Sequence, residues 1–138
     1  MNYKISLSLV VLFLIASCAT TVNFPVSETV PGADITAKIK LDVNKNYKIN
    51  LKAENLTSPE RLNPPREMYV VWIETGRGTK NLGQLEMSSG LFSTTQKGSL
   101  ITTTPFEPKR IIITAERTSS NNEPSSYVIT SSENFEID

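Results

Sequence analysis

Three groups of residues in this chain have types and spacing that could do chemistry. Cys18 is the only cysteine, and two small residues precede it. Glu74 and Glu116 each end an apolar stretch. A pair of carboxyl groups can supply the general acid and the general base or nucleophile of glycoside hydrolysis. Oxygen-bearing side chains alternate from Asp42 to Asn46, as in a calcium loop. Histidine is absent, so neither an imidazole base nor a thiolate and imidazole metal cluster is available.

The cysteine lies in a recognisable order of residues, Ile15-Ala16-Ser17-Cys18. This order resembles a lipobox, the motif at which signal peptidase II cleaves before a cysteine that carries a diacylglyceryl thioether. The residues before it agree, because one lysine is followed by an apolar run over 5–15. Eleven helical residues span about 16 Å, roughly half of a bilayer's hydrocarbon core, which favours a cleaved signal over a membrane span. We expect cleavage between Ser17 and Cys18 and lipidation of Cys18.

This interpretation predicts a location and a partner. Acyl chains on Cys18 would hold the chain on a membrane outside the cytoplasm. Ala19 stands where an aspartate would favour retention in the inner membrane of some diderm bacteria, so we expect the periplasmic side of the outer membrane. Basic and acidic residues are equal at 14 each, so no net charge attracts nucleic acid. No residue pattern calls for a cofactor.

Beyond the cysteine, apolar and polar residues alternate with the period of β-strands. The alternation runs over 34–43, resumes over 47–54, and is interrupted by Asn44-Lys45-Asn46, which predicts a hairpin. A loop rich in proline, 55–66, should carry the chain to a second sheet. The segment 68–73 is apolar on both faces, as expected of a central strand with Trp72 in the core.

The remaining strands are expected over 81–87, 98–104, 110–116 and 126–131, with a turn at 76–78. About seven short strands with regular turn signals predict an all-β fold, an immunoglobulin-like sandwich of antiparallel strands after an N-terminal signal helix. The expected organisation is a signal peptide (1–17), a short lipidated tether (18–23), the sandwich (24–131) and a polar C-terminal tail (132–138). The length allows one domain.

The stretch from Leu56 to Ile129 resembles the extracytoplasmic C-terminal domain of anti-sigma-K factors. The resemblance lies in Tyr69-Val70-Val71-Trp72-Ile73-Glu74, in Leu82-Gly83-Gln84-Leu85 and in Ile113-Thr114-Ala115-Glu116 with a polar loop up to Pro124. It implies a β-sandwich sensor or scaffold domain. Those factors also carry a cytoplasmic sigma-binding domain and a membrane-spanning helix, where this chain has a lipobox. The chain should therefore not bind a sigma factor itself.

Each candidate site has a simpler alternative. The calcium-loop match fails at Tyr47, where glycine permits the sharp turn, so a turn without metal is favoured over weak calcium binding. Gly76-Arg77-Gly78 is better explained as a hairpin turn than as an anion cradle. Glu74 and Glu116 form an enzymatic pair only if the fold brings them together. The sequon at Asn55 is taken as incidental.

Recognition is expected on the loop around Arg61 and Arg66, because binding residues tend to lie on loops held by a rigid scaffold. Tyr69, Trp72, Phe92 and Phe106 are the aromatic residues best suited to a hydrophobic contact, unless they pack in the core. The sequence thus favours a lipid-anchored, non-catalytic envelope module that binds or scaffolds a protein, a glycan or another ligand, whose identity the sequence does not give. The alternative is a carboxylate-dependent hydrolase on a β-sandwich.

Overall fold

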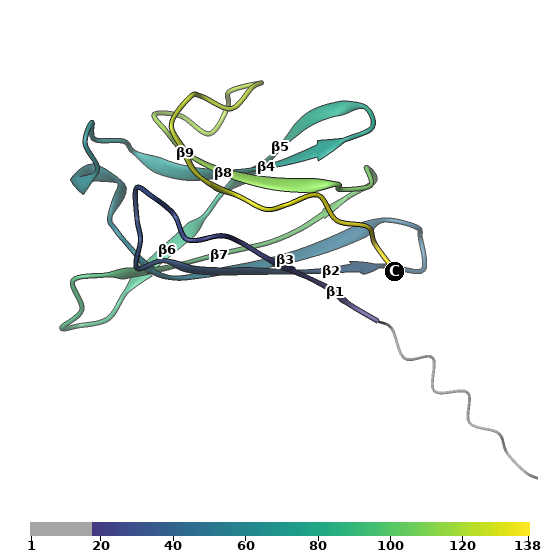
Figure 1. Ribbon diagram of the computed structural model, residues 1–138, viewed down its shortest axis with the longest axis horizontal. Coiled ribbons are helices and arrows are strands. Elements are labelled where there is room, and N and C mark those ends of the chain that lie inside the picture. The colour runs from purple at the N-terminus through teal and green to yellow at the C-terminus, as the bar shows by residue number, and fades with distance from the viewer. Residues whose placement is uncertain (1–17) are drawn as a thin grey trace, which may run out of the picture.

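The computed structural model describes residues 18–138, which fold into two antiparallel sheets packed face to face (Figure 1). The five-stranded sheet has the order β1-β2-β3-β7-β6, and the four-stranded sheet has the order β5-β4-β8-β9. The strands are β1 (Thr20–Asn23), β2 (Asp34–Leu41), β3 (Tyr47–Leu56), β4 (Met68–Thr75), β5 (Gly78–Gln84), β6 (Glu86–Ser89), β7 (Gln96–Thr104), β8 (Arg110–Glu116) and β9 (Val128–Ser131), and η1 (Pro59–Arg61) is a short 3-10 helix. The expected all-β sandwich is confirmed, with nine strands in the described residues instead of about seven.

The core lies between the sheets and is built by the alternation seen in the sequence. Ile39 on β2 and Ile49 on β3 are directly opposite each other and fully buried, while their lysine neighbours face solvent. The facing sheet contributes Tyr69, Val71 and Ile73 from β4. The predicted β2–β3 hairpin is therefore confirmed, and its register buries the apolar residues of the alternation from Ile35 to Ile39 and from Ile49 to Ala53, whereas Leu41 beside the turn is exposed.

Strand β4 is buried on both faces, as predicted for 68–73. Its outer face carries Val70 and Trp72, which pack with Ile112 of β8 in a second apolar cluster. The segment 117–127, between β8 and β9, lies on the outer side of this sheet (Figure 1). Asn81 of β5 holds that segment by donating from Nδ2 to the carbonyls of Ser119 and Asn121, at 2.8 and 2.9 Å.

The prediction of one strand over 81–87 is wrong. The chain leaves the four-stranded sheet after Gln84 and enters the five-stranded sheet at Glu86, so Leu85 is the corner between β5 and β6. Leu85 is buried and its N–H donates to the Tyr69 carbonyl at 2.9 Å. Because apolar residues continue through the corner, the sequence pattern does not reveal the change of sheet.

The sandwich extends past both expected boundaries. The residues Thr20–Asn23, which we expected in the tether, form β1. This strand pairs with β2, and its first residue, Thr20, lies opposite Ile39. Residues 132–138, expected as a polar tail, pack Phe135 and Ile137 against the core. The Asp138 N–H donates to Thr20 Oγ1 at 3.2 Å, so the C-terminal segment joins the edge of the first strand.

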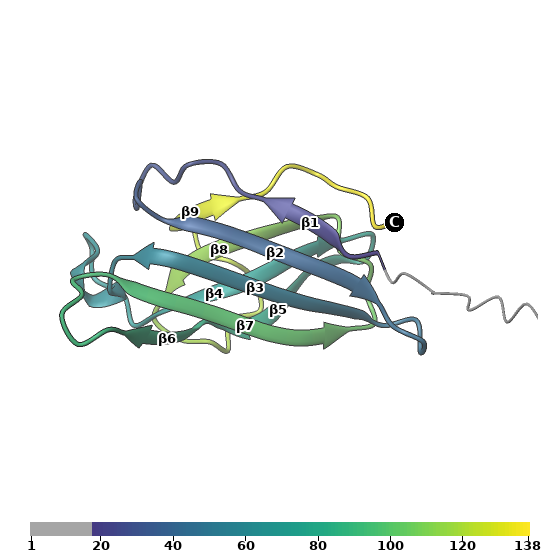
Figure 2. The same cartoon turned by 90° about the horizontal axis from the view of Figure 1, so that it is seen from below.

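The long axis of the sandwich has two distinct ends (Figures 1 and 2). The start of β1, the β2–β3 turn and the C-terminus lie at one end, here called the Cys18 end. The loop 57–66 and the β6–β7 hairpin lie at the other, here called the far end. Within residues 18–138, no helix is long and apolar enough to cross a membrane.

Candidate functional site

Cys18 is exposed and is separated from the first strand by Ala19 alone. Its thiol is free and accessible, as a lipidation site requires. The expected signal peptide (1–17), including Ser17 on the other side of the expected cleavage site, lies outside the described residues. A lipid attached to Cys18 would hold the sandwich close to the membrane surface, because β1 begins two residues after Cys18 and its first residue already pairs with β2.

Glu74 and Glu116 are far apart. They lie on the neighbouring strands β4 and β8, but Glu74 is opposite Arg110 while Glu116 is opposite Met68, at the other end of the ladder. Six residues of strand separate the two positions, which corresponds to about 20 Å. Carboxyl groups that act together on a glycosidic bond are about 5 to 9.5 Å apart. The fold therefore does not bring the two carboxylates together as a catalytic pair.

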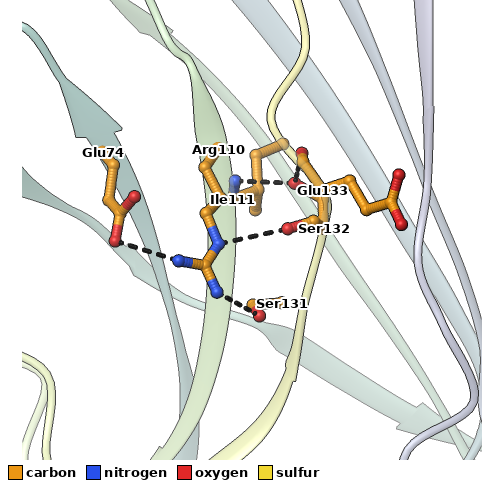
Figure 3. Close-up of polar contacts among 6 residues, drawn as sticks. All are labelled: Glu74, Arg110, Ile111, Ser131, Ser132 and Glu133. Atoms are coloured by element: carbon orange, nitrogen blue, oxygen red, sulfur yellow. Dashed lines mark hydrogen bonds and ion pairs between the residues drawn. The ribbon is translucent and has the colours of Figure 1, made fainter.

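Glu74 belongs to a cluster that joins three strands around Arg110 (Figure 3). The guanidinium pairs with Glu74 Oε1 at 3.5 Å, donates from Nη2 to Ser131 Oγ at 2.8 Å, and donates from Nε to the Ser132 carbonyl at 3.1 Å. Ser132 Oγ in turn accepts the Ile111 N–H at 3.0 Å and donates to the Glu133 carbonyl at 2.9 Å. The contacts of Arg110 with Glu74 and Ser131 tie β4 and β9 to β8, and the Ile111 N–H bond to Ser132 Oγ holds the residue after β9, so the cluster stabilises the sheet.

Glu116 is buried beneath the segment 117–127. Its Oε1 accepts from Thr114 Oγ1 at 2.6 Å and from the Ser125 N–H at 2.8 Å, while Oε2 accepts from Asn121 Nδ2 at 3.1 Å. Thr114 Oγ1 also accepts the indole N–H of Trp72 at 2.8 Å. A carboxylate with this many donors is held in place structurally, and it secures the segment that covers Trp72.

The carboxylate of Asp42 is engaged by its own turn. Its Oδ1 accepts the N–H groups of Asn44 and Asn46 at 2.8 and 2.9 Å, and Lys45 adopts a φ of 61° between them. This arrangement is a side-chain cap on a hairpin turn. No group of three or more potential acidic, histidine or cysteine ligands occurs among residues 18–138.

Arg61 and Arg66 lie at the far end, on the loop that crosses between the sheets. Arg61 is exposed, whereas Arg66 is half-buried with its guanidinium 4.9 Å from the ring centre of Tyr127. The Tyr127 hydroxyl donates to the Asn63 carbonyl at 3.1 Å, which ties this loop to the end of the segment 117–127. The two arginines therefore differ, with Arg66 holding the loop and Arg61 free to contact a partner.

The start of that loop is also anchored. The Tyr69 hydroxyl donates to the Thr57 carbonyl at 2.5 Å, and burial raises the pKa of Tyr69, with smaller contributions from Tyr127 and Glu60. The Ser58 hydroxyl bonds to the Glu60 carboxylate and lowers its pKa. The loop is thus held at Thr57 and at Asn63, and Arg61 lies on the short helix between the two.

Of the aromatic candidates, only Phe92 is fully presented to solvent. Tyr69 and Trp72 are completely buried, and Phe106 is half-buried with Lys80 Nζ 4.7 Å from its ring centre. Phe92 and its neighbour Leu91 are exposed at the tip of the β6–β7 hairpin. Leu91 was not identified from the sequence as a candidate contact residue. The only signal for its exposure is its position next to Gly90 in a polar stretch, which is typical of a turn. A hollow of about 290 Å³ separates this hairpin from the loop of Arg61, with Pro59, Glu60, Met87 and Gln96 among its lining residues.

A scan against known family models and searches of curated proteins and solved structures found no match for this chain.

Proposed function

We propose that this chain is a lipid-anchored, non-catalytic module of the cell envelope that binds or scaffolds a partner through its far end. The observation that carries the proposal is the placement of its parts. Cys18 lies beside the first strand at one end, and the loop of Arg61 lies at the opposite end of the long axis (Figure 2). A module anchored at Cys18 would present that loop away from the attachment point.

The chemistry of the far end suits binding. Arg61, Leu91 and Phe92 are exposed, and arginine and aromatic side chains carry much of the binding energy at protein interfaces. The loop that carries Arg61 is held by hydrogen bonds at Thr57 and at Asn63, so it would lose little conformational freedom on binding. The partner we propose is an envelope protein or a glycan at the same surface.

We propose that the module is non-catalytic because the two carboxylates considered as a catalytic pair each have a structural role. Glu74 pairs with Arg110, and Glu116 holds the segment 117–127. The preferred location, the periplasmic side of a diderm outer membrane, rests on Ala19 following Cys18. The resemblance to anti-sigma-K C-terminal domains adds a role in envelope stress signalling as a prediction, which the identity of neighbouring genes would test.

The binding role is tested by crosslinking in the native envelope followed by mass spectrometry. Wild type is compared with a double variant, Arg61→Ala with Phe92→Ala, and with Arg77→Ala, an exposed arginine in the β4–β5 turn at the Cys18 end. We expect the double variant to lose its specific crosslinks and Arg77→Ala to keep them. An unchanged crosslink pattern in the double variant would remove the far end as the binding surface.

A further inference from the structure

The outer face of the β2–β3 hairpin is divided by charge. From the far end to the Cys18 end, its successive cross-strand pairs are Asp34 with Glu54, Thr36 with Lys52, Lys38 with Asn50, and Lys40 with Lys48. The carboxylates lie at the far end, and the four lysines occupy the three pairs nearest Cys18. These lysines, here called the lysine face, are all exposed. A chain with equal numbers of acidic and basic residues thus concentrates positive charge on the three pairs of this face nearest Cys18.

The lysine face is not neutralised from within the domain. Lys40 and Lys48 are directly opposite each other, a placement of like charges that destabilises a sheet. The two ion pairs found among residues 18–138 join Lys97 to Glu54 and Arg110 to Glu74, so neither involves any of these four lysines. An anionic surface would offset the repulsion that the fold leaves in place.

A hollow between two of these lysines is lined entirely by polar side chains. Thr36, Lys38, Asn50 and Lys52 line a cavity of about 280 Å³, and the buried Oδ1 of Asn50 has no hydrogen-bond partner. The ammonium groups of Lys38 and Lys52 suit a phosphate. Phosphatidylglycerol carries such a phosphate in its headgroup.

The turn at the end of this hairpin carries exposed apolar side chains. Val43 is 97% exposed and Leu41 is 46% exposed, with Lys45 beside them in the turn. Apolar side chains flanked by lysines are characteristic of segments that enter the membrane interface, where the ammonium groups reach the headgroups.

Both features lie next to the lipid attachment point. Thr21, three residues after Cys18, is opposite Lys38 on β2, so Cys18 is within about 10 Å of the lysine face along the strand. Figure 2 shows the start of β1 and the β2–β3 turn at the same end of the sandwich.

We propose that the lysine face and Val43 dock onto an anionic phospholipid surface next to the anchored Cys18. This inference rests on the lipid anchor of the proposed function. Asp34, at the other end of the face, is repelled by the same surface, whereas Glu54 is paired with Lys97 at 3.9 Å. The positive charge is therefore strongest at the Cys18 end, so the domain tilts and lifts its far end. The tilt keeps the loop of Arg61 accessible to a partner.

The test uses the full lipidated chain with Val43→Cys, whose new thiol is free for labelling because Cys18 carries the lipid. A polarity-sensitive fluorophore is attached to this thiol. The protein is then reconstituted into two kinds of vesicle, one that contains phosphatidylglycerol and one made of phosphatidylcholine alone. We expect a blue shift, and quenching by quenchers on the lipid chains, in phosphatidylglycerol only. The matched control is Val26→Cys, an exposed valine in the loop after β1, at which no shift is expected.

The lysines are tested in the same system. Lys40→Gln with Lys48→Gln should lower the equilibrium constant for docking about fivefold per lysine, so about 25-fold together. An equal signal at positions 43 and 26, or a shift unaffected by the lysine variant, would overturn the inference. So would binding of a soluble glycerol phosphate polymer to the lysine face without a shift at position 43. A chain that fails to float with either vesicle would instead refute the anchor.

Discussion

Glu74 and Glu116 lie on adjacent strands of one sheet, yet they are at opposite ends of the ladder that joins those strands. Glu74 is half-exposed and pairs with Arg110, while Glu116 is buried and accepts hydrogen bonds from three residues. Two carboxylates that look equivalent in the sequence therefore have different structural roles. The difference leads directly to a prediction about stability.

We expect Glu116→Ala to lower the free energy of unfolding by about 2 kcal/mol, because Thr114, Asn121 and the Ser125 N–H lose their buried acceptor. Glu74→Ala should cost less than about 1 kcal/mol, since its ion pair is partly exposed. Urea unfolding followed by fluorescence of Trp72, the only tryptophan, measures both. Glu123→Ala, exposed on the same segment, is the control, and an equal loss in all three variants would contradict the proposed role of Glu116.

The turn at Asp42 should be independent of calcium. We expect Asp42→Ala to lower the free energy of unfolding by about 1 kcal/mol, since two N–H groups lose a side-chain acceptor. Asp42→Asn keeps an acceptor oxygen and should retain most of the stability. Thermal unfolding with excess calcium and with a chelator should give the same midpoint for wild type. A midpoint that rises with calcium only while Asp42 is present would indicate a metal site.

Tyr69 makes the fold sensitive to alkaline pH. Burial raises the pKa of its hydroxyl above the ordinary value of 10.0, so the folded state keeps the proton after the unfolded state has lost it. The stability that Tyr69 contributes is therefore complete below pH 10 and declines as pH rises further, by at most about 1.4 kcal/mol per pH unit.

Tyr69→Phe checks this pH dependence. The variant loses the hydrogen bond to the Thr57 carbonyl, so it should be less stable at neutral pH by about 1 kcal/mol. Its stability should fall less steeply than that of wild type in urea titrations above pH 10. Parallel curves for the two proteins would show that another group governs the alkaline transition.

Gly98 is required by close packing on β7. A Cβ at this position would lie 3.1 Å from Cδ1 of both Leu56 and Leu85 and 3.2 Å from the Met87 sulfur. We expect Gly98→Ala to lower the free energy of unfolding by about 1 to 3 kcal/mol through overpacking. Gly90→Ala, whose Cβ would be 3.7 Å from Ser93 Cβ, should be nearly neutral in the same urea experiment. Equal effects would mean that the side chains around Gly98 relax freely.

The sequence predicted the parts of the fold that depend on local alternation. The β2–β3 hairpin follows from period-two patterning around a turn, and β4 follows from an apolar run of β-branched and aromatic residues. The corner at Leu85 was missed because the same apolar residues suit one strand or two. The packing of Phe135 and Ile137 was missed because two single apolar residues in a polar segment are too few to show the period of a strand or a helix.

The candidate site was less predictable because it depends on contacts between distant segments. Glu116 is buried only because residues up to Ser125 fold back over it, and Arg66 differs from Arg61 only because Tyr127 lies beneath its guanidinium. The lysine face needed the strand register, since Lys40 and Lys48 become neighbours only when β2 pairs with β3. Cys18 is different, because its expected chemistry depends on adjacent residues alone.

The central claim, that the chain is anchored through Cys18, is tested most directly by mass spectrometry of the N-terminal peptide of the protein purified from its membrane. We predict a peptide that begins at Cys18 and carries the mass of a diacylglyceryl group, and we predict that Cys18→Ala abolishes both the cleavage and the added mass. A peptide that retains residues before Cys18, or one that begins at Cys18 with an unmodified thiol, would contradict the account.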